Sequence, residues 1–158
     1  MRIILEGVDG AGKTTLAKIL AERYGLDICH CGTTDPADYH FYRETSRKDN
    51  VVWDRHTLGE LIYPKVFDRK QQCCPEDARI VLQLGKQELG LKTLVLTADI
   101  DVLKSRLNAR GNEHPKILEN LEWIDEQFRW YAEDFHLPLI DTSKMTLDEI
   151  FKLIEKEN

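Results

Sequence analysis

Residues 7–15 read GVDGAGKTT, a complete G-x-x-x-x-G-K-[ST] phosphate loop. The apolar run 3–5 before the loop predicts a buried strand. Apolar residues recur after the loop at helical spacing, at Leu16, Ile19, Leu20 and Tyr24, and predict a helix from about Lys13. In this strand–loop–helix arrangement, backbone N–H groups surround phosphate oxygens at the positive end of the helix. The loop therefore predicts that this chain binds a nucleoside triphosphate.

Within the loop, Lys13 is expected to reach the β- and γ-phosphates of ATP, and the Thr14 hydroxyl is expected to ligate Mg²⁺. A glycine-rich turn that only joins a strand to a helix is the alternative. The predicted nucleotide-binding residues are Gly7, Asp9, Gly10, Ala11, Gly12, Lys13, Thr14 and Thr15. The cofactors expected from this motif are ATP and Mg²⁺.

The chain has 158 residues, enough for one domain over 1–158 with a core that needs no disulfides. Its net charge of −6 gives no general basic surface for a nucleic-acid backbone, although a basic cleft stays possible. No apolar stretch approaches the length of a membrane span, and the first predicted strand follows Met1 directly. We therefore expect no membrane contact and a cytoplasmic location, in the host cytoplasm if a phage encodes the chain.

The four cysteines stand in two short groups, Cys29 with Cys31 and Cys73 with Cys74. Neither group has the two-residue gap that lets paired thiolates close on one zinc ion. In the cytoplasm they are expected to be reduced, and packing as small apolar side chains is the expected role.

Strand and helix patterns alternate along the rest of the chain. Strands are predicted at 26–32, 51–53, 93–98 and 137–140, and helices at 57–63, 75–89, 101–110 and 115–134. Thr146 and Glu149 form a capping box that predicts a final helix. This alternation predicts a three-layer α/β fold with a five-stranded parallel sheet. Its ligands should gather at the carboxyl ends of the strands.

Three polar residues follow predicted strands at that edge. Asp54 comes directly after strand 51–53. Its carboxylate is expected to steady Mg²⁺, and the alternative is that Asp54 is the N-cap of the next helix. Arg55 is suited to contact a phosphate in transit, with a surface ion pair as the alternative. Asp35 follows the second strand and either faces the ligand or forms a turn.

Arg106 and Arg110 are four residues apart, so they share one face of the helix predicted at 101–110. They lead into a polar segment that predicts a lid at about 110–116. Such a lid can close over a nucleotide and bring an arginine to the transferring phosphoryl group. Two solvated surface arginines are the alternative.

Several motifs together resemble the thymidylate kinase family. The start of the chain at 6–15 is similar to the family's opening, and Asp54-Arg55-His56 resembles its Asp-Arg-aromatic motif. Asp35-Pro36 stands where the family carries Glu-Pro. Segments 103–111 and 139–143 resemble its arginine-bearing helix and its adenine-side loop. The overall pattern is most similar to the short phage-type members.

The resemblance implies that the α/β fold is a P-loop kinase fold with a short lid. It also implies a kinase of nucleotide biosynthesis that uses ATP and Mg²⁺. It implies that Arg55 binds the phosphate of the acceptor, that Arg106 lies near the adenine and that Arg110 is the lid cation. Together with Lys13 of the phosphate loop and with Asp35, Arg55 and Arg110 make up the predicted catalytic residues. The chain is short for the family and lacks the arginine that precedes Glu-Pro, unless Arg43 or Arg47 replaces it.

Three acceptors stay open. The first is a deoxynucleoside monophosphate, thymidylate or a modified pyrimidine nucleotide. The second is a deoxynucleoside, with Asp35 as the base that removes the hydroxyl proton. The third is a hydroxyl of a DNA base or end, for which Tyr39, Phe41, Tyr42 and Phe67 could stack an unpaired base or could simply pack between helices. The expected partner is thus a small nucleoside or nucleotide, nucleic acid is less favoured, and a homodimer is possible.

Overall fold

The computed structural model describes residues 1–32, 35–111 and 113–156, which form an α/β fold on a parallel sheet. The strand order is β2-β3-β1-β4-β5, and every neighbouring pair is parallel. The strands are β1 (Arg2–Gly7), β2 (Asp27–His30), β3 (Val51–Asp54), β4 (Leu91–Thr97) and β5 (Leu139–Asp141). The predicted five-stranded parallel sheet is confirmed.

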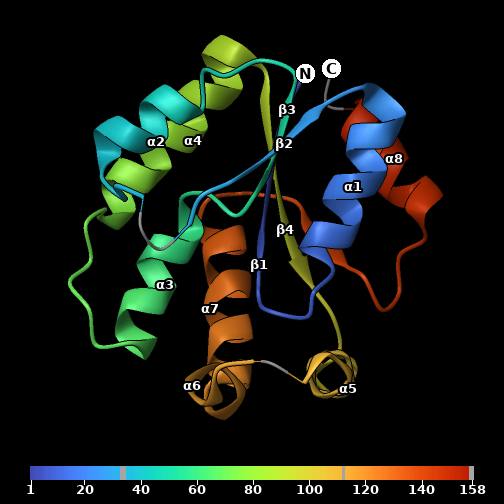
Figure 1. Cartoon of the computed structure of the whole chain (residues 1–158). Helices are drawn as coiled ribbons and strands as arrows, with labels where there is room; N and C mark the ends of the chain where they lie inside the picture. The colour runs from blue at the N-terminus through green and yellow to red at the C-terminus, as the bar shows by residue number, and fades with distance from the viewer. Residues whose placement is uncertain (33–34, 112, 157–158) are drawn as a thin grey trace.

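Helices cover both faces of this sheet (Figure 1). They are α1 (Lys13–Tyr24), α2 (Tyr39–Thr45), α3 (Leu58–Val66), α4 (Pro75–Leu89), α5 (Ile100–Arg110), α6 (Pro115–Glu119), α7 (Leu121–Asp134) and α8 (Leu147–Lys156). α1 packs on β1, β2 and β3, with α8 beside it, and α3, α4 and α7 pack on the opposite face. The fold therefore has the three layers that the sequence predicts.

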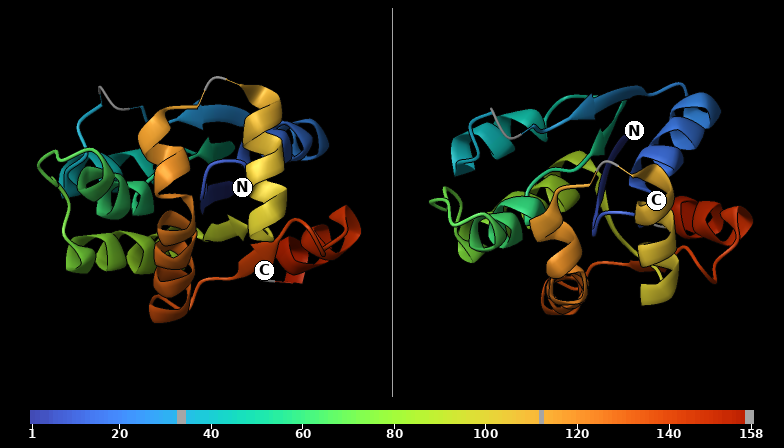
Figure 2. Two further views of the ribbon diagram at one scale, coloured as in Figure 1. Left: turned by 90° about the horizontal axis from the view of Figure 1, so that it is seen from below. Right: turned by 60° about the horizontal axis from the view of Figure 1, so that its bottom comes forward.

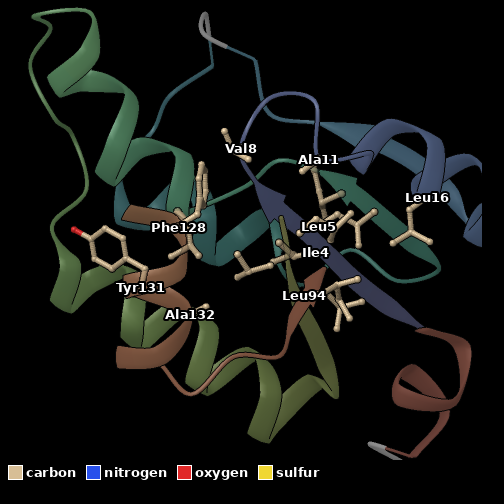
Figure 3. Packing of buried hydrophobic residues seen from close by; sticks show 14 of the residues in the cluster. Ile4, Leu5, Val8, Ala11, Leu16, Leu94, Phe128, Tyr131 and Ala132 are labelled. Carbon is tan, nitrogen blue, oxygen red and sulfur yellow. The ribbon is translucent and has the colours of Figure 1, made fainter. Parts of the chain in front are cut away.

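The core lies on both sides of β1 because this strand is apolar on both faces. Ile3, Ile4 and Leu5 are all fully buried, as expected for a central parallel strand. Figure 3 shows Ile4 and Leu5 among side chains that come from other elements, such as Leu94 of β4 and Phe128 of α7. This packing fixes the carboxyl end of β1, from which the phosphate loop extends.

The prediction of one continuous helix at 115–134 is wrong. Asn120 interrupts it with φ −108° and ψ 12°, so that α6 ends at Glu119 and α7 starts at Leu121. The Asn120 amide Nδ2 donates to the carbonyl oxygen of Lys116 at 2.7 Å, which is local hydrogen bonding that competes with a continuing helix. Seen from below, α5 and α7 stand on either side of the loop after β1 (Figure 2).

Other boundaries differ less. α4 coincides with the predicted range 75–89, and the capping box is present, with Thr146 N and Oγ1 each donating to Glu149 at 2.8 Å. The strand predicted at 26–32 is shorter, because β2 lies at the sheet edge, where Ile28 is 48% exposed.

Among the described residues, no helix is both long and apolar enough to cross a membrane.

Candidate active site

The loop between β1 and α1 holds a buried ammonium group. Lys13 Nζ donates to the carbonyl oxygens of Gly7 and Val8, each at 2.8 Å. Burial first, and then the charge of Arg55, lowers the pKa of Lys13 to about 8. Gly12, the N-cap residue of α1, provides no capping side chain, so the first N–H groups of this helix can donate to an anion. These are the parts of a phosphate-binding site.

Gly7 is required at the start of the loop. Its φ is +134°, and a Cβ there would overlap the carbonyl oxygen of Leu96 on the neighbouring strand β4. The sequence folds locally in this way because only glycine combines this φ with so close an approach of two backbones.

Thr14 and Asp54 form a pair in front of the loop. Thr14 Oγ1 donates to Asp54 Oδ2 at 2.6 Å, and Asp54 Oδ1 is buried without a protein partner. The pairing of Leu5 with Asp54 in the sheet places the end of β3 beside the end of β1. Asp54 is not the N-cap of α3, since Thr57 holds that position. The two side chains offer the oxygen ligands that Mg²⁺ prefers.

Arg55 lies over the side of the phosphate loop. Its guanidinium pairs with Asp9 Oδ1 and is centred 5.3 Å from the ring of Tyr63, whose hydroxyl donates to Asp9 Oδ2 at 2.6 Å. Burial alone would raise the pKa of Asp9, but the charges of Arg55 and Lys13 hold it below its usual value. The Asp9 carboxylate thus holds Arg55, and the prediction that Asp9 binds the nucleotide stays a prediction.

A wide cavity of about 480 Å³ opens on one side of the loop; we name it the α1/α8 cavity. Its walls are Gly10, Gly12, Thr15, Leu16, Ile19, Arg106, Arg110, Thr142, Met145, Leu147 and Ile150. Arg106 Nη1 donates to the carbonyl oxygen of Gly10 at 3.1 Å and to Thr142 Oγ1 at 2.9 Å, which joins two walls. Arg110 pairs with Glu113 at 2.6 Å.

A narrower cavity of about 200 Å³ opens on the other side; we name it the α3 cavity. Its lining residues are Cys31, Gly32, Asp35, Pro36, Ala37, Tyr42, Arg55, His56, Gly59, Glu60, Tyr63, Phe67, Arg69, Gln72 and Ile117. Asp35 Oδ2 accepts from Gly32 N at 2.7 Å, so this residue forms a turn and also lines the cavity. Burial lowers the pKa of His56 to about 3, which keeps its ring neutral.

Arg69 is a cavity residue that sequence reasoning missed. Its Nη1 and Nη2 donate to the two carboxylate oxygens of buried Glu60 at 3.0 and 2.6 Å, and Gln72 N donates to Glu60 at 2.8 Å. Arg69 follows α3 in a connection without a motif, so the sequence carries no signal for it.

Most predicted site residues thus surround one loop. Lys13, Thr14, Asp54 and Arg55 lie together at the carboxyl ends of β1 and β3, with the two cavities on either side. Arg43 and Arg47 do not reach the α3 cavity; both line a separate small cavity with residues of α4. The predicted lid at 110–116 includes Asn112, which lies outside the described residues.

The fold and this loop define a kinase of the P-loop class. Residues 3–127 match the family AAA_18, described as an AAA domain, and the chain belongs to this family. The chain is 29% identical over 161 residues to the SPbeta prophage-derived uncharacterized protein YorR of Bacillus subtilis, covering 95% of this chain and 94% of YorR. It is also 29% identical over 123 residues to the "Putative adenylate kinase" of Methanocaldococcus jannaschii, covering 77% of this chain and 66% of that protein.

Solved structures show the same fold. YorR in complex with phosphorylated GDP superposes with a TM-score of 0.80 at 26% identity, covering 99% of this chain and 94% of that chain. The thymidylate kinase of Candida albicans superposes with a TM-score of 0.61 at 18% identity, covering 98% of this chain and 90% of that chain. The sequence relatives include the putative adenylate kinase of M. jannaschii, and the expectation of a kinase enzyme is confirmed.

Proposed function

We propose that this chain transfers the γ-phosphoryl group of ATP to a deoxynucleoside monophosphate, with thymidylate or a modified pyrimidine nucleotide as the acceptor. The observation that carries the proposal is the placement of the phosphate loop between two cavities, with Arg55 between the loop and the α3 cavity. YorR binds phosphorylated GDP and the C. albicans relative is a thymidylate kinase, which supports a nucleotide ligand.

The donor is assigned to the α1/α8 cavity. Its apolar wall of Leu16, Ile19 and Leu147 suits a purine ring, and Arg106 with Thr142 supplies polar contacts at the same end. The triphosphate then extends into the loop, where Lys13 and the first N–H groups of α1 bind it.

Thr14 and Asp54 fit a bound Mg²⁺. Both present oxygen atoms, and Asp54 Oδ1 lacks a partner in the protein. Within residues 1–32, 35–111 and 113–156, no group of three or more His, Cys, Asp or Glu side chains could hold a metal. This agrees with Mg²⁺ held by few protein ligands and by phosphate oxygens. When bound, the ion neutralises charge on the phosphates.

The acceptor is assigned to the α3 cavity. Arg55 would bind its phosphate, and the guanidinium of Arg110 would leave Glu113 to reach the transferring group as the lid closes. Catalysis is then a matter of position and charge, because a phosphate oxygen attacks without the help of a strong base.

A deoxynucleoside is the second candidate, because Asp35 lines the α3 cavity and its carboxylate is oriented by Gly32 N. In that case Asp35 would remove the proton of the attacking hydroxyl. The two candidates differ in how strongly they need this carboxylate.

The test is ATP consumption with deoxynucleosides, their monophosphates and short DNA. Turnover with monophosphates supports the proposal, and turnover with deoxynucleosides or DNA alone contradicts it. Asp35→Asn should lower kcat by roughly 10²–10⁴ for a hydroxyl acceptor and should mainly raise KM for a monophosphate. The matched control is Asp38→Asn, which makes the same change of carboxylate to amide at the N-cap of α2, outside the α3 cavity, and keeps an oxygen that can accept from Phe41 N.

A further inference from the structure

Glu6 directly precedes Gly7, where the phosphate loop begins, and has no part in the function proposed above. Glu6 is fully buried on β1; its Oε1 accepts from Leu58 N at 2.7 Å, and its Oε2 has no partner. Burying a carboxyl with one oxygen unpaired costs free energy. A structural contribution of comparable size should offset that cost.

Glu6 acts as the cap of α3. Thr57 occupies the N-cap position of this helix, but its side chain makes no capping hydrogen bond. The first N–H groups of a helix need acceptors, and Glu6 supplies one from the neighbouring strand. The start of α3 is therefore tied to β1 rather than to its own preceding residue.

The segment between β3 and α3 is held at both ends by consecutive residues of β1. Arg55 N donates to the carbonyl oxygen of Leu5 at 3.0 Å, and Leu58 N donates to Glu6. Between these anchors, Arg55 has a φ of +74°, a left-handed conformation that is unfavourable for a residue with a side chain. In this conformation its guanidinium pairs with Asp9 and lies over the ring of Tyr63.

We infer that Glu6 is a positioning residue for Arg55: by capping α3 from β1, it holds segment 55–58 in the shape that presents the guanidinium to the phosphate of the acceptor. This inference rests on the proposed function, in which Arg55 binds that phosphate. Glu6 touches no substrate, so its effect on the reaction passes through Arg55.

A double-mutant cycle tests the inference with Glu6→Leu, Arg55→Gln and the double variant. Glu6→Leu should raise KM for the acceptor about tenfold and leave KM for ATP within about twofold, as expected for one lost buried hydrogen bond. Glu6→Gln keeps the acceptor oxygen and should stay within about threefold of the wild type. In the double variant, Glu6→Leu should add nothing to the loss caused by Arg55→Gln.

Additive losses, or equal rises in the two KM values, would overturn the inference, since both describe a general weakening of the fold. If Glu6→Leu does not fold, Glu6→Asp should give the same selective rise, because its shorter side chain draws the carboxylate away from Leu58 N. Asp49→Ala is the control: it removes an exposed carboxylate that pairs with Met1 N and Arg2 at the opposite edge of the sheet, and it should leave both KM values unchanged.

Amide hydrogen exchange at Leu58 separates this inference from the proposed function. The Leu58 amide should be protected in the wild type and in Glu6→Gln and should exchange faster in Glu6→Leu, whether or not any nucleotide is phosphorylated. A wild type with a protected Leu58 but no turnover would refute the proposed function alone. Unchanged protection in Glu6→Leu would refute the role of Glu6 alone.

Discussion

The hydroxyl of Thr14 and the carboxylate of Asp54 are joined by a hydrogen bond of 2.6 Å, although 40 positions separate the two residues along the chain. The bond forms because β1 and β3 are adjacent parallel strands, which end at the same edge of the sheet. Thr14 lies in the first turn of α1 and Asp54 is the last residue of β3, and together they provide the oxygen ligands of the proposed Mg²⁺ site.

In the Asp54→Asn variant, Mg²⁺ should no longer strengthen the binding of ATP. We expect kcat or the affinity for MgATP to fall roughly 10- to 100-fold, while the affinity for ATP without Mg²⁺ changes little. Titration calorimetry with and without Mg²⁺ measures the difference. Asp99→Asn is the control, because that exposed carboxylate pairs with Lys144 at 2.7 Å outside the site. Equal loss of binding in both conditions would argue against a metal ligand.

Arg69 should contribute to acceptor binding. Because its removal alone would leave buried Glu60 without a cation, the informative variant is Arg69→Met combined with Glu60→Gln. We expect KM for the acceptor to rise about tenfold with KM for ATP unchanged, since the pair lines only the α3 cavity. Arg43→Met is the control and should change neither KM value. Steady-state kinetics with each substrate varied in turn measures KM for the acceptor and KM for ATP.

Glu6 should make stability depend on pH. Burial raises its pKa from 4.5 to about 7, so between these values the folded chain keeps a proton that the unfolded chain has released. The folded state then binds more protons, and the free energy of unfolding falls as pH rises from about 4.5 to 7, by roughly 3 kcal/mol from this group. Glu6→Gln removes this contribution, so urea unfolding of the two proteins at several pH values should diverge as pH increases.

Two glycines should respond differently to alanine. Gly90 has φ +63° with open space around it, so Gly90→Ala should cost about 1–2 kcal/mol of conformational strain. At Gly7, a Cβ would also overlap the Leu96 carbonyl, and Gly7→Ala should cost more than about 3 kcal/mol. Urea unfolding of both variants is the measurement; similar losses would mean that the neighbouring strand can move.

The sequence predicts the fold and one half of the site because both depend on short-range patterns. The phosphate loop, the buried strand before it and the capped helix after it occupy consecutive residues, so their relative placement follows from local geometry. Asp54 and Arg55 could be found because parallel strands end at one edge.

The other half depends on contacts that leave no local pattern. Glu60 and Arg69 belong together only because the chain after α3 turns back, and neither has a spacing that a motif would reveal. Asp9 stands inside the motif, but its pairing with Arg55 joins residues 46 positions apart and has no signal in the sequence. Asn120 could not be recognised as a break because its neighbours continue the helical periodicity.

Arg106 has a consequence for the thermodynamics of nucleotide capture. It bonds to the carbonyl oxygen of Gly10 and to Thr142, and the Thr142 hydroxyl is also 3.0 Å from the carbonyl oxygen of Ala11, so opposite walls of the α1/α8 cavity are already joined. We therefore expect these two walls to lose little chain entropy when a nucleotide enters. The donor side should behave as a preorganised receptor whose selectivity depends on shape complementarity.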